Sequence, residues 1–183
     1  MEDKLYLIHK KYGESAELLI QLYHTAYPDR DILELLSLDY ICRMDALRFA
    51  KGKTAQSSAS TYVYLFGAKF DFWEGTPAWH CSDIPFAFHN TELVPASFIS
   101  GVSDRLEQEI AGVWTAFART GDPNHEGLIY WPAYHEQHGA TMIFDSSNRI
   151  KTGHDSELIK TLAKRLPPFK AAEKYARLAM ERE

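Results

Sequence analysis

Apolar residues in the first third of the chain recur at the spacing of helices. The first series ends before Pro28 and comprises Leu18, Leu19, Leu22 and Tyr23. The next series ends at Arg48 and comprises Ile32, Leu35, Leu36, Ile41, Met44 and Leu47. Because residues three and four apart lie on one face of a helix, these series predict one helix before Pro28 and one or two helices after it.

A run of β-branched and aromatic residues follows a short polar patch. The run is Thr61–Phe66, with the sequence Thr-Tyr-Val-Tyr-Leu-Phe, and these residue types are enriched in strands. Its nearly continuous apolar character is typical of a strand that is covered on both faces, as in a parallel sheet. Residues 67–77 are then expected to form a loop rich in aromatic side chains.

The most regular helical pattern of the chain lies in its second half. Ser103 is a suitable N-cap with Asp104 in the first turn, and Gly121 followed by Pro123 ends the helix. Its expected buried stripe comprises Leu106, Ile110, Val113, Trp114 and Phe117. Residues 93–102 before this helix are expected to be irregular.

The last part of the chain adds a strand and a helix. Residues 141–145, Thr-Met-Ile-Phe-Asp, predict a strand. A final helix is expected to begin at Asp155 or Ser156 and to end at Pro167. The charged tail, residues 169–183, predicts a solvated helix.

Composition limits the class of protein. The 183 residues are 45% hydrophobic and 25% charged, which is typical of a soluble globular protein and sufficient for a single domain over residues 1–183. The net charge of −5 and the lack of a basic stripe argue against nucleic-acid binding. No apolar run approaches the roughly 20 residues of a membrane span.

The start of the chain and its cysteines bear on location. The sequence Met1-Glu2-Asp3-Lys4 lacks the apolar region of a signal peptide. Two cysteines, Cys42 and Cys81, do not make a disulfide framework. A cytoplasmic location is therefore expected.

Residues 78–88, Ala-Trp-His-Cys-Ser-Asp-Ile-Pro-Phe-Ala-Phe, have the pattern of a catalytic histidine loop. His80 is followed three residues later by Asp83, and then by an apolar-Pro-aromatic run that would hold the loop on a core. Taken alone, His80 would more often be a core or surface histidine than a catalyst. Two further segments give this motif its weight: Trp114-Thr-Ala-Phe-Ala-Arg-Thr-Gly-Asp-Pro-Asn124 with Trp131-Pro-Ala-Tyr134, and Met142-Ile-Phe-Asp145.

In order and spacing these segments resemble the type-B carboxylesterase/lipase family, which includes para-nitrobenzyl esterases and cholinesterases. The resemblance runs from about Leu5 to about Leu166 and implies an α/β fold: the C-terminal portion of an α/β-hydrolase, helix-rich and with a few strands of its mostly parallel sheet. It also implies hydrolysis of a small carboxylic ester through an acyl-serine intermediate, with no cofactor and no metal.

The resemblance assigns roles by position. His80 would be the general base and acid, because an imidazole exchanges protons near neutral pH. Asp83 stands where the family usually has Glu and would support the loop by hydrogen bonding. Cys81 stands where the family commonly has Gly or Ala. Four aromatic residues are candidates for the substrate pocket, with core packing left open for the loop members: Phe72, Trp73, Trp79 and Phe86.

The rest of the catalytic machinery does not match. The family nucleophile lies in a G-x-S-x-G elbow between a strand and a helix. The nearest match, residues 13–17, has Glu17 in place of the last glycine, so Ser15 is expected to be a helix N-terminal residue. Glu2 and Asp3 are triad-acid candidates only by default, and no Gly-rich oxyanion segment is present. The serine, the acid and the oxyanion hole are therefore expected in N-terminal sequence beyond this chain, and the isolated chain is expected to be inactive.

Three alternatives stay open at this point. A metal site would combine His80, Cys81 and Cys42 with Asp83 or His89, but zinc ligands usually occur as paired residues at tight spacings, and adjacent His-Cys is poor geometry. His89 with Glu92 forms a second H-x-x-E pattern, although the family usually has glycine at position 89, and a loop residue is expected there. The chain could instead be a non-catalytic module that associates with itself or with the missing N-terminal part, through the open edge of residues 61–66.

Overall fold

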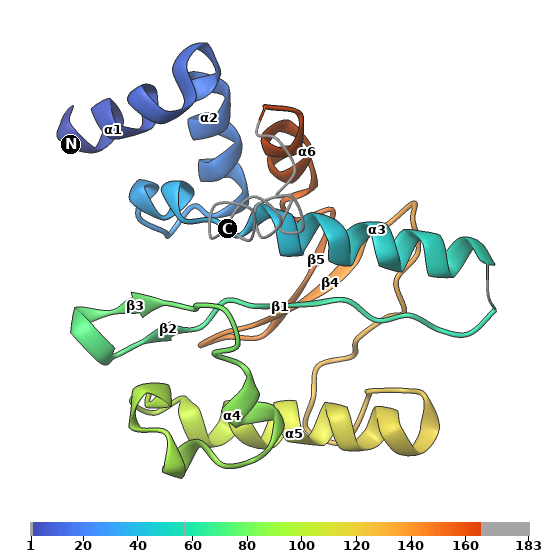
Figure 1. Cartoon of the computed structure of the whole chain (residues 1–183). Helices are drawn as coiled ribbons and strands as arrows, with labels where there is room; N and C mark the ends of the chain where they lie inside the picture. The colour runs from blue at the N-terminus through green and yellow to red at the C-terminus, as the bar shows by residue number, and fades with distance from the viewer. Residues whose placement is uncertain (1, 57, 166–183) are drawn as a thin grey trace, which may run out of the picture. The chain divides into compact units, whose positions relative to one another are not determined.

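The computed structural model describes residues 2–56 and 58–165 (Figure 1). These residues form two compact units. One comprises residues 2–46 and 155–165, and the other comprises residues 47–56 and 58–154. The prediction of a single domain over residues 1–183 stays a prediction.

The first unit is helical. Its helices are α1 (Glu2–Tyr12), α2 (Ala16–Ala26), the start of α3 (Tyr40–Gln56) and α6 (Ser156–Arg165), with 3₁₀ turns at Gly13–Ser15 and Ile32–Leu36. They enclose a core of Ile8, Ala16, Leu19, Tyr23, Ala26, Leu35, Leu158 and Leu162. The helical prediction for the first third is confirmed, as is the start of the last helix at Ser156. Leu18, expected on the buried face, is exposed.

A buried ion pair lies beside this core. Arg43 of α3 donates from Nε and Nη2 to both carboxylate oxygens of Asp155, at 2.9–3.1 Å. Tyr27 donates its hydroxyl to Asp155 Oδ2 at 3.0 Å. Burial, followed by the charge of Asp155, raises the pKa of Tyr27, so its hydroxyl keeps its proton and serves as a donor.

The second unit contains a mixed sheet in the order β1-β4-β5. Strand β1 (Tyr64–Phe66) runs parallel to β4 (Ala140–Phe144), with Tyr64 opposite Met142, and β4 runs antiparallel to β5 (Arg149–Thr152). The predictions of a strand near residues 61–66, of parallel pairing and of a strand near residues 141–145 are confirmed. The first strand is shorter than expected, since it begins at Tyr64.

The predicted aromatic loop at residues 67–77 contains a small hairpin. Strands β2 (Lys69–Phe70) and β3 (Thr76–Pro77) pair antiparallel around a 3₁₀ turn at Phe72–Glu74. Short helix α4 (Ile84–Ala87) follows and lies along α5 (Ser103–Thr120) (Figure 1). Two 3₁₀ turns, Thr91–Leu93 and Pro95–Ser97, occupy part of the stretch near residues 93–102 that was expected to be irregular.

Helix α5 confirms most of its prediction and corrects two details. Gly121 ends it in the left-handed region at φ 77°, where glycine has no Cβ penalty. Ser103 does not cap the helix: its hydroxyl accepts from Ile99 N–H and donates to the Ser97 carbonyl, so it fastens the preceding turn instead. Three stripe residues are buried, namely Leu106, Ile110 and Val113, whereas Trp114 and Phe117 are 48% and 41% exposed.

The core of the second unit joins α4 and α5 to the sheet. Its buried members are Ala68, Phe70, Phe86, Ile99, Leu106, Ile110, Val113, Trp131, Met142 and Phe144. Within the described ranges, no helix is long and apolar enough to cross a bilayer. The predicted tail helix at residues 169–183 and the end of the last helix at Pro167 lie outside the described residues.

Candidate functional site

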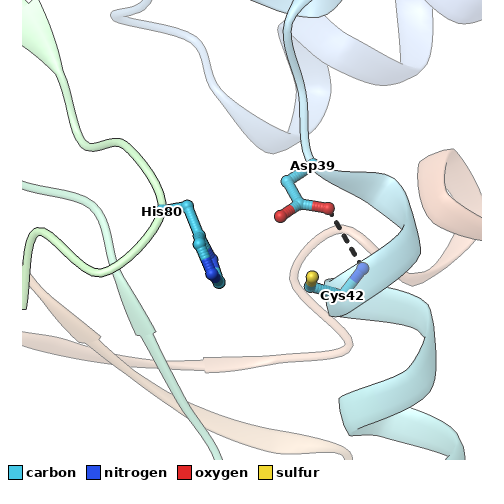
Figure 2. Close-up of side chains that lie close together, drawn as sticks. All are labelled: Asp39, Cys42 and His80. Atoms are coloured by element: carbon cyan, nitrogen blue, oxygen red, sulfur yellow. Dashed lines mark hydrogen bonds between the residues drawn. The ribbon is translucent and has the colours of Figure 1, made fainter. Parts of the chain in front are cut away.

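His80 lies on an exposed turn between β3 and α4. Two overlapping backbone bonds close this turn: Ser82 N–H donates to the Trp79 carbonyl at 3.0 Å, and Ile84 N–H donates to the Cys81 carbonyl at 3.2 Å. Figure 2 shows the imidazole extending from the loop. Among residues 2–56 and 58–165 the ring has no hydrogen-bond partner, so both ring nitrogens are open to other groups.

Asp83 connects the same turn to the sheet. The Tyr64 hydroxyl, on β1, donates to Asp83 Oδ2 at 2.6 Å. Asp83 also stands at the N-cap position of α4, but its side chain makes no capping bond there. The carboxylate therefore connects the loop to the strand and does not cap the helix.

Tyr64 is the residue of this site that sequence reasoning missed. Its ring meets three other rings edge-on, those of Trp114, Trp131 and Phe144, at centroid distances of 5.8–6.3 Å. Burial raises the pKa of the Tyr64 hydroxyl, and the bond to Asp83 and its charge raise it further. The one clue in the sequence is a hydroxyl-bearing ring in the middle of an otherwise apolar strand, a group that needs a partner when buried.

The turn passes through the left-handed region at a residue that is not glycine. Cys81 has φ 68°, a conformation that disfavours side chains with a Cβ by about 1–2 kcal/mol. The resemblance placed glycine or alanine at this position, and the positive φ gives a physical reason for glycine. His89, in the turn after α4, has φ 54° at the second position where glycine was expected, and its Nδ1 lies 3.9 Å from Glu107 Oε2.

We expect Cys81→Gly to raise the free energy of unfolding by about 0.5–1 kcal/mol, because glycine adopts the left-handed conformation without strain and the exposed thiol loses little packing. Urea unfolding measures the change. Cys42→Gly is the matched control: that exposed cysteine lies within α3, where glycine costs a few tenths of a kcal/mol. A change in the free energy of unfolding with the same sign in both variants would contradict strain at Cys81.

The aromatic candidates differ in exposure. Trp79 lies over Phe70 at a centroid distance of 4.6 Å and is 42% exposed. Phe72 and Trp73 stack at 4.7 Å, and Trp73 is 84% exposed. Phe86 is fully buried in the core, 5.2 Å from the Phe66 ring. Three of the four candidates, Phe72, Trp73 and Trp79, are thus exposed, whereas Phe86 is a core residue.

The Gly13–Ser15 segment does not have the surroundings of a nucleophile elbow. Helix α1 precedes it, where an elbow needs a strand, and Ser15 is only 4% exposed. Ser15 occupies the N-cap position of α2, as expected, but its hydroxyl makes no capping bond. At the start of α3, by contrast, Asp39 accepts from Cys42 N–H at 3.1 Å (Figure 2) and does serve as a cap.

A hollow of about 810 Å³ lies elsewhere in the second unit. Its lining residues are Thr54, Ala55, His135, Glu136, Gln137 and His138. None of the predicted site residues belongs to it.

Comparison with known proteins decides the family. The model of the carboxylesterase family matches residues 20–161. The chain belongs to the carboxylesterase family. Both the histidine turn and helix α5 fall inside the matched range.

Individual relatives agree with this assignment. The para-nitrobenzyl esterase of Bacillus subtilis is 33% identical over 122 residues, which cover 62% of this chain and 25% of that protein. An esterase from Clostridium hathewayi, described as able to hydrolyse aliphatic aromatic polyesters, superposes with a TM-score of 0.80 at 38% identity, over 88% of this chain and 32% of that one. A thermophilic para-nitrobenzyl esterase superposes at 0.62 with 25% identity, over 88% of this chain and 33% of that one.

These neighbours are α/β-hydrolase esterases, so the prediction of a partial α/β-hydrolase fold is confirmed. The chain spans about a quarter to a third of the length of the relatives named.

Proposed function

We propose that this chain is the histidine-bearing C-terminal segment of a carboxylic-ester hydrolase. In this proposal His80 takes the proton from a serine hydroxyl as that oxygen attacks the ester carbonyl. His80 then returns a proton to the leaving alcohol, and repeats the exchange with water to release the acid. The serine, the triad acid and the oxyanion-hole amides come from sequence outside residues 1–183.

The observation that carries the proposal is the setting of His80. The carboxylesterase family match includes a histidine that is exposed, carries an imidazole without a hydrogen-bond partner in the described ranges, and lies on a turn tied to the sheet through Asp83. A general base has to meet a serine and an acid from other segments, and an exposed ring on a fixed turn suits that task. Phe72, Trp73 and Trp79 are proposed to contact the ester, with Phe86 supporting them from the core.

A chimera tests the proposal. The region of the Clostridium hathewayi esterase that this chain matches is replaced by residues 1–183, and hydrolysis of p-nitrophenyl butyrate is measured. We expect ester turnover from the chimera and none from this chain alone. A serine-directed fluorophosphonate should label the chimera once per molecule and should not label the isolated chain. Labelling of the isolated chain would show that it builds its own nucleophile site, and would overturn the proposal.

The same sheet supports a second function, association without catalysis. Within the described residues β1 pairs only with β4, so its other edge is open for pairing with a further strand. Because the similar esterases are about three times as long as this chain, the partner that we propose for this edge is the N-terminal part of such an esterase. Association in sedimentation experiments fits both functions, whereas esterase activity that depends on His80 fits only the first. Cys42 and Cys81 are exposed and form no disulfide with each other, which suits the reducing cytoplasm that we propose as the location of the protein.

A further inference from the structure

We infer that Tyr64 is a positioning residue for His80, acting through Asp83 to fix the histidine turn on the sheet. This inference rests on the proposed function of His80. Tyr64 does not touch the reacting groups. Its hydroxyl reaches the carboxylate three residues beyond the histidine, at 2.6 Å.

The turn is held at both ends, and His80 lies between the two points. On one side the Trp79 ring packs on the Phe70 ring of β2 at 4.6 Å. On the other side Asp83 accepts the bond from β1. Between them the chain passes through Cys81 in a strained left-handed conformation, which persists only where the surroundings enforce it.

The strand end of this connection is held by backbone pairing and by ring contacts. Tyr64 pairs with Met142 in the parallel β1–β4 register, and three aromatic rings, those of Trp114, Trp131 and Phe144, surround its phenol. Because its burial keeps the hydroxyl protonated, the phenol is a permanent donor. A hydrogen bond to a carboxylate is among the stronger ones in proteins. This bond therefore fixes the position of the turn relative to the strand.

The chemistry of Asp83 points the same way. An aspartate at an N-cap ordinarily accepts from the amides of the first helical turn. Asp83 makes no such bond, although it stands at the cap of α4. The carboxylate instead binds a residue 19 positions earlier in the chain, which is the behaviour of a tertiary anchor.

Hydrogen exchange on the 183-residue chain tests the anchor without any activity. We expect Tyr64→Phe to speed exchange of the Ser82 and Ile84 amides, which close the turn, by about 10- to 100-fold, the range for losing a hydrogen bond to a charged group. Asp83→Ala should do the same, and Asp83→Asn, which keeps an acceptor oxygen, should restore slow exchange. Tyr62→Phe is the matched control, because that hydroxyl interacts with Asp122 instead. Unchanged exchange in Tyr64→Phe would overturn the inference.

Kinetics of the chimera test the consequence for His80. Tyr64→Phe and Asp83→Ala should each lower kcat about 10-fold with little change in KM, and the double variant should be no worse than either single one. Faster exchange with unchanged kcat would show a merely structural bond and overturn the positioning role. Failure of the proposed function would give a different result: His80→Ala would then leave turnover intact, whatever the effect of the Tyr64 variants.

Discussion

Replacing His80 by alanine in the chimera should lower kcat for p-nitrophenyl butyrate by at least about 10⁴-fold. Without the imidazole, nothing takes the proton from the nucleophilic serine or returns one to the leaving alcohol, and residual turnover comes from the oxyanion hole and binding alone. Substrate binding does not use the ring, so KM should change little. Steady-state kinetics of the two purified proteins give both quantities, and the fluorophosphonate adduct should disappear with the histidine.

His89→Ala is the matched control for this experiment. His89 lies nine residues further on, is exposed in a turn and also precedes a glutamate, Glu92, by three positions. Since its ring lies beside the Glu107 carboxylate at 3.9 Å, and the resemblance gives no catalytic role to position 89, kcat should stay within about 3-fold of the parent. A large loss in His89→Ala with little loss in His80→Ala would assign the general base to the second H-x-x-E and contradict the proposed role of His80.

Much of the fold could be predicted because local pattern decides it. Helix α5 ends where glycine supplies a left-handed cap, and that requirement can be read from Gly121 and Pro123 alone. The parallel partner of β1 followed from a strand apolar on nearly every residue. A loop carrying His80 was expected from the resemblance of residues 78–88 to the family, and the structure has a turn there.

Features that depend on distant neighbours could not be predicted in this way. Periodicity put Trp114 and Phe117 on the buried face of α5, but each stays about half exposed, because a large ring at the border of a stripe reaches past the core. The side-chain bond of Ser103 goes to a preceding turn that no spacing rule describes. The bond between Tyr64 and Asp83 depends on how a strand and a loop meet in space. Asp83 could be predicted because it belongs to the histidine motif, but its partner Tyr64 lies outside that motif.

The Arg43–Asp155 pair is the extreme case, because its two residues are 112 positions apart in the chain and neither stands in a motif. Both side chains are almost fully buried, at 6% and 1% exposure. We expect Arg43→Met and Asp155→Leu each to lower the free energy of unfolding by about 3–5 kcal/mol, since each leaves a buried charge without its partner. Urea unfolding followed by circular dichroism measures the loss.

The double variant Arg43→Met/Asp155→Leu distinguishes the effect of losing the whole ion pair from the effect of losing one partner. Because desolvating two charges offsets most of their attraction, replacing both by apolar side chains should cost much less than either single change. The remaining loss should be about 1 kcal/mol, from the Tyr27 hydroxyl that then lacks its acceptor. Lys160→Ala is the surface control: its bond to Glu157 is exposed on both sides, and such pairs contribute about 0–1 kcal/mol. Two results would contradict a buried pair whose charges neutralise each other. One is a free energy of unfolding for the single variants that is as high as that of the Lys160→Ala control. The other is a loss in the double variant that equals the sum of the losses in the single variants.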